Sequence, residues 1–343
     1  MHDFDEVAAR LRDEKQGGRT LRRGAARLAV CERGARVMAA DAGDGSADAL
    51  YLADDDAGEL CGGDRFWLGP EVAWFWPSLQ AAREDPVKHA ATPPQLDPGR
   101  WGVGEADAGS VTLHATMGLT DARDGRKIRL EAERTVRLID PPPSLSAGVS
   151  AVAYAVDHRL TALGGEEGVV ASSWSIAQVP PGGTLVCPTV RPLSVADDVT
   201  RYYDPFGDDH VKADADAVRF VIDARRRIKM GLRAEDTTGR MGYLRPLGDG
   251  RAVLLLRFFP TLPGERYCDV PRSADAGVRG GGDCLQAYND DLTYGPFGEM
   301  EHHDPAVEVG GVENRCHSST TLVLAGDEAA VRRDGGRLLG ATL

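Results

Sequence analysis

The stretch KIRLEAERTVRLI, from Lys127 to Ile139, decides the fold class. Apolar and polar side chains alternate along it, and because successive side chains of a strand point to opposite faces, this period of two predicts a long, half-buried β-strand. A strand with one wet face is typical of antiparallel sheets. The residues expected on the buried face are Ile128, Leu130, Ala132, Val136 and Leu138. Those expected on the solvent-facing side are Lys127, Arg129, Glu131, Glu133, Thr135 and Arg137.

Short apolar segments punctuated by Gly, Pro and Asp lie on both sides of this strand and predict further strands. A helix is predicted only at the start of the chain, where Phe4, Val7, Ala8 and Leu11 recur at helical spacing after Asp3, up to about Lys15. Many strands without alternating helices indicate a sandwich or barrel. The predicted strands are 27–31 and 36–40, which form a hairpin, and 110–116, 150–156, 169–179, 184–187, 218–222, 228–232, 252–259 and 319–325.

The chain has 343 residues, of which 42% are hydrophobic, so it can bury a large core. We expect one domain over residues 1–343, with 1–20 as an N-terminal helical extension. A domain boundary at Pro141-Pro142-Pro143 is the alternative. Two long loops, Phe75 to Gly99 and Pro260 to Gly282, are expected to be binding walls or disordered.

Charge and composition exclude several classes of function. The net charge of −13 is spread along the chain and argues against nucleic-acid binding. There is no long apolar run for a membrane and no signal-peptide pattern, so we expect a cytoplasmic protein. The six cysteines stand singly and predict buried free thiols. We expect no cofactor and no resident metal, and the sequence leaves the oligomeric state open.

The first segment that could carry chemistry is CGGDRFWLGPE, from Cys61 to Glu71, with Trp74, Phe75 and Trp76 just after it. Aromatic faces beside charged hydrogen-bonding groups suit a sugar, which offers apolar C–H patches and peripheral hydroxyls. Arg65 could donate several hydrogen bonds to such a ligand. The alternative is that the aromatic residues are core and Arg65 is a structural ion pair. The candidate substrate contacts are Arg65, Trp67, Glu71 and Trp74.

The second segment runs from Tyr288-Asn289-Asp290 through Tyr294 to the sequence GEMEHHDP at 298–305. If it is extended, Glu299, Glu301 and His303 share one face and could perform acid/base chemistry or bind a metal. The alternative is a solvated acidic edge strand. These three are the candidate catalytic residues. The remaining candidate substrate contacts are Asn289 and Tyr294 here, and Trp174 and Gln178 in the segment SSWSIAQVPPG at 172–182.

Together these segments resemble an uncharacterised bacterial family related to the aldose 1-epimerases, within the galactose-mutarotase-like superfamily. The resemblance rests on GGDRFWLGPE (62–71), VSAVAYAVDHRLTALG (149–164), SSWSIAQVPPG (172–182), IKMGL (228–232) and QAYNDDLTYGPFGEME (286–301). It implies a β-supersandwich whose concave groove holds a sugar, with Arg65 positioning the substrate. It also implies that Glu299 or Glu301 removes the anomeric hydroxyl proton while a mid-chain histidine protonates the ring oxygen. The region of Trp174 offers no histidine, so His158 or His114 would have to substitute.

We therefore expect a partner that is a small carbohydrate, and an isomerase that epimerises its anomeric carbon by acid/base catalysis. Two alternatives stay open: a non-catalytic carbohydrate-binding protein, and an enzyme resembling polysaccharide lyases or hydrolases. A fold of this kind serves all three classes, so only the site can separate them.

Overall fold

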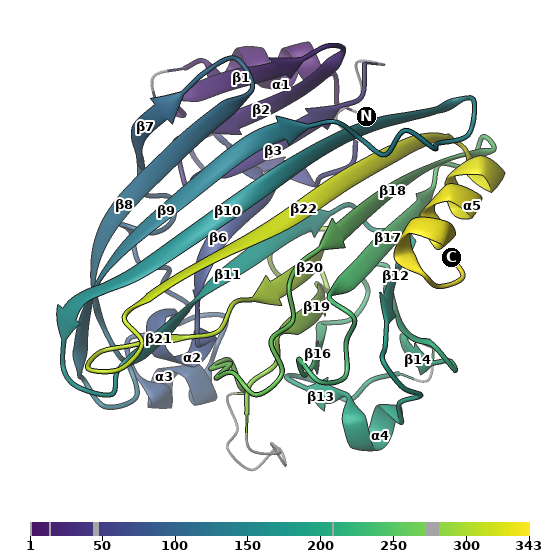
Figure 1. Cartoon of the computed structure of the whole chain (residues 1–343). Coiled ribbons are helices and arrows are strands. Elements are labelled where there is room, and N and C mark those ends of the chain that lie inside the picture. Colours follow the sequence, from purple (N-terminus) through teal and green to yellow (C-terminus); the bar gives the residue numbers. More distant parts are fainter. Residues whose placement is uncertain (1, 14, 44–47, 208, 272–280) are drawn as a thin grey trace.

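Two large antiparallel sheets face each other across the core in the computed structural model, which describes residues 2–13, 15–43, 48–207, 209–271 and 281–343 (Figure 1). We call the sheet nearer the viewer the front sheet and the other the back sheet. The front sheet has the strand order β14 (Val211–Ala213), β15 (Ala217–Ile222), β12 (Gly183–Pro188), β17 (Arg240–Pro246), β18 (Arg251–Phe258), β22 (Asn314–Asp327), β10 (Val149–Gly165), β9 (Lys127–Ile139), β8 (Ser110–Thr120), β7 (Gly102–Ala106).

The back sheet carries the segments that the sequence singles out. Its strand order is β1 (Gly18–Arg23), β2 (Ala26–Cys31), β3 (Arg36–Asp41), β6 (Asp64–Gly69), β11 (Val170–Val179), β20 (Gly298–His303), β19 (Leu285–Asn289), β16 (Ile228–Leu232), β13 (Thr200–Arg201). The short strand β21 (Val307–Glu308) also pairs with β11, and β4 (Leu52–Asp54) and β5 (Leu60–Gly62) form a separate hairpin. The all-β sandwich predicted from the sequence is therefore confirmed.

Strand β9 has the bounds that its alternation predicts. Ile128, Leu130 and Val136 are buried, and they join the large apolar cluster between the two sheets. Arg134 also lies on the buried parity and is fully enclosed, which the pattern of apolar residues does not reveal. Its guanidinium donates to Asp64 of the back sheet at 2.9 Å, so a charged pair is built into the core.

The helices correct one prediction. Helix α1 (Phe4–Leu11) begins after Asp3, whose side chain accepts from the backbone N–H groups of Asp5 and Glu6, as the sequence predicts. A second helix, α5 (Glu328–Leu339), was not predicted from the sequence. Asp327 caps it, and it covers the outer face of β17, β18 and β22, as Figure 1 shows. The shorter helices are α2 (Glu71–Trp74), α3 (Leu79–Glu84) and α4 (Val195–Asp198).

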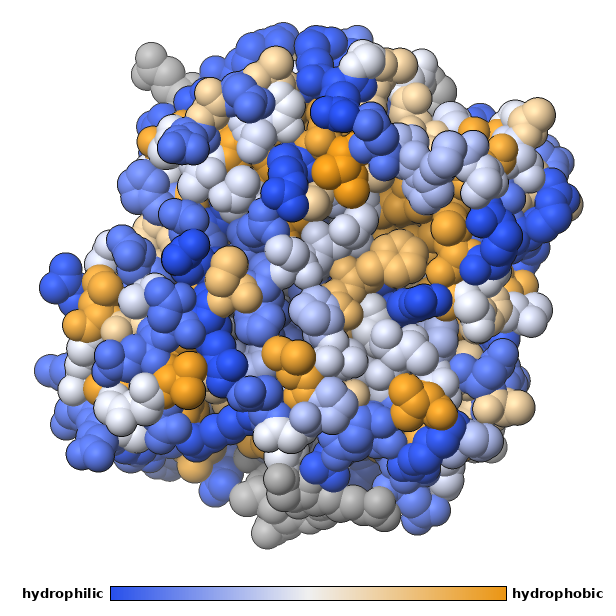
Figure 2. Space-filling view, viewed as in Figure 1, coloured by the Kyte–Doolittle hydropathy of each residue, from blue (hydrophilic) through white to orange (hydrophobic). Residues whose placement is uncertain are grey.

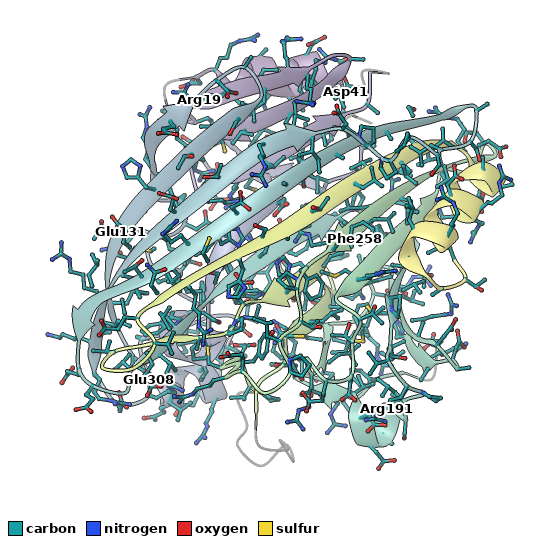
Figure 3. The ribbon with its side chains drawn as sticks, in the orientation of Figure 1. Arg19, Asp41, Glu131, Arg191, Phe258 and Glu308 are labelled. Atoms are coloured by element: carbon teal, nitrogen blue, oxygen red, sulfur yellow. The ribbon has the colours of Figure 1, made fainter. Side chains whose placement is uncertain are left out.

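The outer face of the front sheet is mainly hydrophilic, and its hydrophobic side chains gather beside α5 (Figure 2). Figure 3 labels Glu131 of β9 and Phe258 of β18 on this side of the molecule. Leu254, Leu256 and Leu339 belong to the apolar cluster under α5, which is separate from the core between the sheets. The helix therefore covers apolar surface that the back sheet cannot reach.

The six cysteines are free thiols, and three of them, Cys31, Cys187 and Cys284, are buried. In the described part of the chain, no helix is long and apolar enough to span a membrane. Of the two predicted long loops, the first contains α3, and the second falls partly on residues 272–280, outside the described residues.

Candidate functional site

Five neighbouring strands of the back sheet, β6, β11, β20, β19 and β16, form the floor of a cavity on the face turned away from the core. Residues directly opposite each other in antiparallel strands project to the same face. Glu299 pairs with Gln178 on one side and with Tyr288 on the other, and Tyr288 pairs with Lys229. This row of four residues therefore crosses four strands and lies on one face.

The neighbouring positions follow the same register. Glu299, Glu301 and His303 share one face of β20, as the alternation of an extended segment predicts. Trp174 pairs with His303 on one side and with Trp67 on the other. The two segments identified in the sequence, 61–71 and 286–301, thus meet through β11, which lies between them in the sheet.

The cavity has a volume of about 670 Å³, which is within the usual range for small-ligand sites. The back sheet lies behind the front sheet in Figure 1, so the cavity opens on the side away from the viewer. Its walls come from the β4–β5 hairpin, from the segment that follows β6, and from the loop between β19 and β20. The lining includes Arg33, Arg36, Tyr51, Arg65, Trp67, Glu71, Phe75, Trp76, Asp97, Trp174, Gln178, Tyr203, Arg227, Lys229, Tyr288, Tyr294, Phe297 and Glu299.

Arg65 and Glu299 form an ion pair in this cavity although 234 residues separate them in the chain. The guanidinium donates to Oε1 of Glu299 at 2.8 Å, and the amide of Gln178 donates to the same oxygen at 2.9 Å. The second oxygen, Oε2, accepts no hydrogen bond from the residues that the structure describes and retains contact with the cavity. The pair thus fixes the carboxylate and leaves one oxygen for a ligand.

Glu301 lies beneath the cavity and is fully buried. Its Oε2 accepts from the indole of Trp174 at 2.9 Å and from the ammonium of Lys229 at 3.0 Å. Burial raises the pKa of Glu301 to about 8, against the opposing effect of the Lys229 charge. Burial lowers the pKa of Lys229, but the carboxylates of Glu301 and Glu71 outweigh it, so the net shift is upward. Lys229 therefore keeps its positive charge at the cavity floor.

A second wall combines an indole with a buried ion pair. Trp67 stacks on Phe75 with ring centroids 4.4 Å apart, and the Arg65 guanidinium lies 3.9 Å from the centroid of the Trp67 ring. The indole nitrogen donates to Asp97, which also accepts from Arg36. Burial raises the pKa of Asp97, but Arg36 and Arg65 outweigh it and hold that pKa below its usual value. These contacts hold the aromatic side chains of this wall in place.

Not every predicted site residue reaches the cavity. Trp74 is buried, and its indole nitrogen donates to the carbonyl of Gly69 at 3.1 Å. Asn289 is fully buried and holds the turn before β16 through the backbone N–H groups of Asp223 and Ala224. His303 stacks against Trp174 beneath the cavity and is paired through Nε2 with Gln286. These three residues support the site from below instead of lining it.

The histidines expected to supply a proton lie elsewhere. His158 is buried between the two sheets, beside Phe66, and burial lowers its pKa well below the usual value. His114 is exposed on β8 of the front sheet. No histidine of the described residues lines the cavity. The expectation that His158 or His114 acts on a substrate there is therefore wrong.

Sequence reasoning missed several residues of the site, among them Lys229, Tyr203, Asp97 and Arg227. Lys229 stands alone in the apolar strand IKMGL, and that isolated charge was the signal that could have marked it. Tyr203 donates to Glu71 at 3.0 Å, and Asp97 lies in the long segment after β6. Across the described residues, no group of three His, Cys, Asp or Glu side chains is arranged to hold a metal ion.

Comparison with solved structures defines the class of the fold. A crystal structure of a putative aldose 1-epimerase from Escherichia coli superposes with a TM-score of 0.54 at 12% identity, covering 89% of this chain and 98% of that chain. A galactose mutarotase related enzyme from Lactobacillus acidophilus superposes with a TM-score of 0.51 at 7% identity, covering 89% and 97%. The protein therefore has the galactose-mutarotase-like fold, as the sequence resemblance implies.

Residues 52–343 match the model of a family of unknown function, DUF6786, and the chain belongs to that family. The matched range includes every candidate site residue named from the sequence. The search of curated proteins gave no match.

Proposed function

We propose that the cavity binds a carbohydrate and that Glu299 acts as the base that interconverts the anomers of its reducing end. The observation that carries this proposal is the Arg65–Glu299 pair in the cavity wall, where Oε1 is held by Arg65 and Gln178 and Oε2 is free to accept a proton. A base held by fixed donors is positioned before the substrate arrives, which favours proton transfer. The aromatic wall of Trp67 and Phe75 supplies a face for the sugar ring.

The reaction needs a proton acceptor and a proton donor. Glu299 takes the proton of the anomeric hydroxyl, and the bond between the anomeric carbon and the ring oxygen breaks to give the open-chain aldehyde. The ring oxygen takes a proton from the Lys229 ammonium, which lines the cavity two strands from Glu299. Rotation about the bond next to the aldehyde and closure of the ring return both protons and release the other anomer.

Two-dimensional exchange NMR on a panel of aldoses tests this proposal. We expect the purified protein to accelerate the exchange of α and β signals of at least one sugar. Replacing the base, in Glu299→Gln, should reduce that rate by about 10²- to 10⁴-fold. The matched control is Glu308→Gln. The carboxyl group of Glu308 pairs with Arg266 and does not line the cavity, so this variant should leave the rate unchanged. Rates equal to those in buffer for every sugar would contradict the proposal.

A non-catalytic carbohydrate-binding protein is the second candidate. The absence of histidine from the described lining favours it, because Lys229 is a weak acid when its pKa is raised. Sugar binding with unchanged affinity in Glu299→Gln, and no accelerated exchange in the native protein, would favour this candidate. For either function we propose a cytoplasmic location, since the six thiols are free, as in a reducing compartment.

A further inference from the structure

Most of the cations that line the cavity can be matched with a carboxylate. Arg33 pairs with Asp55, Arg36 with Asp97 and Arg65 with Glu299, and Lys229 pairs with Glu301 below it. Each of these cations therefore has a carboxylate at ion-pair distance. Such pairs cancel at short range and present little net charge to a ligand.

Arg227 is the exception. It lines the cavity, yet no carboxylate of the described residues lies within ion-pair distance of its guanidinium. The guanidinium faces an aromatic ring, and its central carbon lies 5.9 Å from the ring centroid of Tyr203. Asp291 is close enough for Arg227 to contribute to the lowering of its pKa, but hydrogen bonds to Thr293 are the larger cause.

The position of Arg227 relative to Glu299 is set by the sheet. Arg227 comes directly before β16 and two residues before Lys229, so it has the same parity as Lys229. Lys229 pairs with Tyr288, and Tyr288 pairs with Glu299. Arg227 therefore lies two strands across the sheet from Glu299 and two residues along the strand direction. Together these displacements separate the two backbones by roughly 12 Å. Both residues line the same cavity, so one ligand can contact both.

We propose that the sugar bound in this cavity carries an anionic substituent, a carboxylate or a phosphate, which Arg227 binds while Glu299 faces the anomeric carbon. The inference rests on the proposed carbohydrate function and names the class of substrate. A guanidinium presents parallel N–H donors that match both anionic groups. Tyr203, which contacts Arg227 and donates to Glu71, supports the guanidinium at that end of the cavity.

The test compares three probes, D-glucose, D-glucuronate and D-glucose 6-phosphate, by calorimetric titration into the full-length protein. We expect at least one charged sugar to bind about tenfold or more tightly than glucose, because charged hydrogen bonds contribute that much. Arg227→Gln should remove the preference, so that the charged sugars bind this variant no more tightly than glucose does. The preferred probe shows whether the anionic group is a carboxylate or a phosphate.

Arg225→Gln is the matched control, because Arg225 is exposed, lies two residues away and is absent from the cavity lining. This variant makes the same change in net charge and should keep the full preference. If glucose binds as tightly as both charged sugars, or if Arg227→Gln keeps the preference, the inference is overturned and the proposed function stands. If none of the three sugars binds, the inference is overturned, and the exchange measurements on the panel of aldoses decide the proposed function by themselves.

Discussion

Asp64 and Arg65 are consecutive residues of β6, and they serve opposite faces of the back sheet. Asp64 faces the core, where its carboxylate accepts from Arg134, Arg257 and Tyr154 and is fully buried. Arg65 faces the cavity, where it pairs with Glu299, and its side chain is 11% exposed. The core pair leaves no carboxylate oxygen free, whereas the cavity pair leaves one. The arrangement around Asp64 can therefore only stabilise the fold, whereas the Arg65–Glu299 pair can also bind a ligand.

The carboxylate of Asp64 in the core is also harder to neutralise by protonation than the carboxylate of Glu301 at the cavity floor. Two arginines surround the single carboxylate of Asp64, and arginine keeps its proton at any ordinary pH. Burial raises the pKa of Asp64, but Arg257 and Arg134 outweigh it and hold that pKa below its usual value. The buried carboxylate Glu301 instead has a pKa raised to about 8 and can take up a proton. Loss of a partner should therefore cost more at Asp64 than at Glu301.

The largest expected effect follows from removing the carboxylate of the core cluster. In Asp64→Asn, two buried guanidinium groups lose their counter-charge, and we expect the free energy of unfolding to fall by about 3–5 kcal/mol. Urea unfolding followed by circular dichroism measures this change. Asp140→Asn breaks an exposed pair with Arg23 and is the matched control, with a much smaller expected loss. Similar losses in the two variants would contradict the comparison.

How far the sequence predicts this arrangement differs between the two faces. The alternation within a strand predicts correctly that β9 is half-buried and that Glu299, Glu301 and His303 share a face of β20. It does not predict which strands become neighbours, because the pairing of Arg65 with Glu299 joins residues 234 positions apart. The resemblance to a family, and not the periodicity, brought these two segments together.

The missed features have physical reasons. Helix α5 contains Gly335 and Gly336, which weaken any sequence signal for a helix. A Cβ at Gly335 would lie 2.1 Å from Cδ2 of Leu254, so a larger residue there would displace that leucine side chain on β18. Lys229 was missed because a lone charge in an apolar strand gains its meaning from Glu301, which is distant in the chain. Trp74 was assigned to the site by proximity in sequence, although the turn of α2 buries it.

A second prediction concerns pH, which acts on the buried acids. Burial raises the pKa values of Glu301, Asp283 and Asp304, to about 8, 7 and 7 respectively. An acid with a higher pKa in the folded state binds more protons when folded, so its stabilisation is lost as the pH rises through that pKa. Buried histidines with lowered pKa values have the opposite effect, which fades as the pH rises above their ordinary value of 6.5 and offsets part of this loss. Stability should therefore fall by about 2 kcal/mol between about pH 6.5 and about pH 8.5.

Urea unfolding at the two ends of this pH range measures the change. Glu301→Gln removes the acid with the highest of the three pKa values, so most of the decrease should disappear in that variant. Glu308→Gln is the matched control, because this carboxyl pairs with Arg266 outside the cavity lining and should retain the decrease. A decrease of the same size in the native protein and in Glu301→Gln would show that Glu301 is ionised throughout this range.

A third prediction isolates the cavity side of the comparison. Arg65→Gln leaves Glu299 beside the cavity, where water can solvate its carboxylate, so we expect a loss of stability below about 1.5 kcal/mol. Sugar affinity should fall about tenfold, because Glu299 is no longer held in place and a donor to the substrate is lost. Calorimetric titration and urea unfolding on the same preparation give both numbers. A loss of stability as large as that of Asp64→Asn would mean that Arg65 belongs to the core.

The smallest effect is expected at the rim of the cavity, where the loop between β19 and β20 exposes Tyr294. Asp290 accepts from the backbone N–H of Tyr294 at 3.0 Å, so the loop is held independently of the aromatic ring. Tyr294→Ala should change stability by less than about 0.5 kcal/mol, while sugar affinity falls about three- to tenfold through loss of the ring face. Leu292→Ala, in the same loop but absent from the cavity lining, should change neither. Equal affinities in the two variants would confine the aromatic contribution to Trp67 and Phe75, deeper in the cavity.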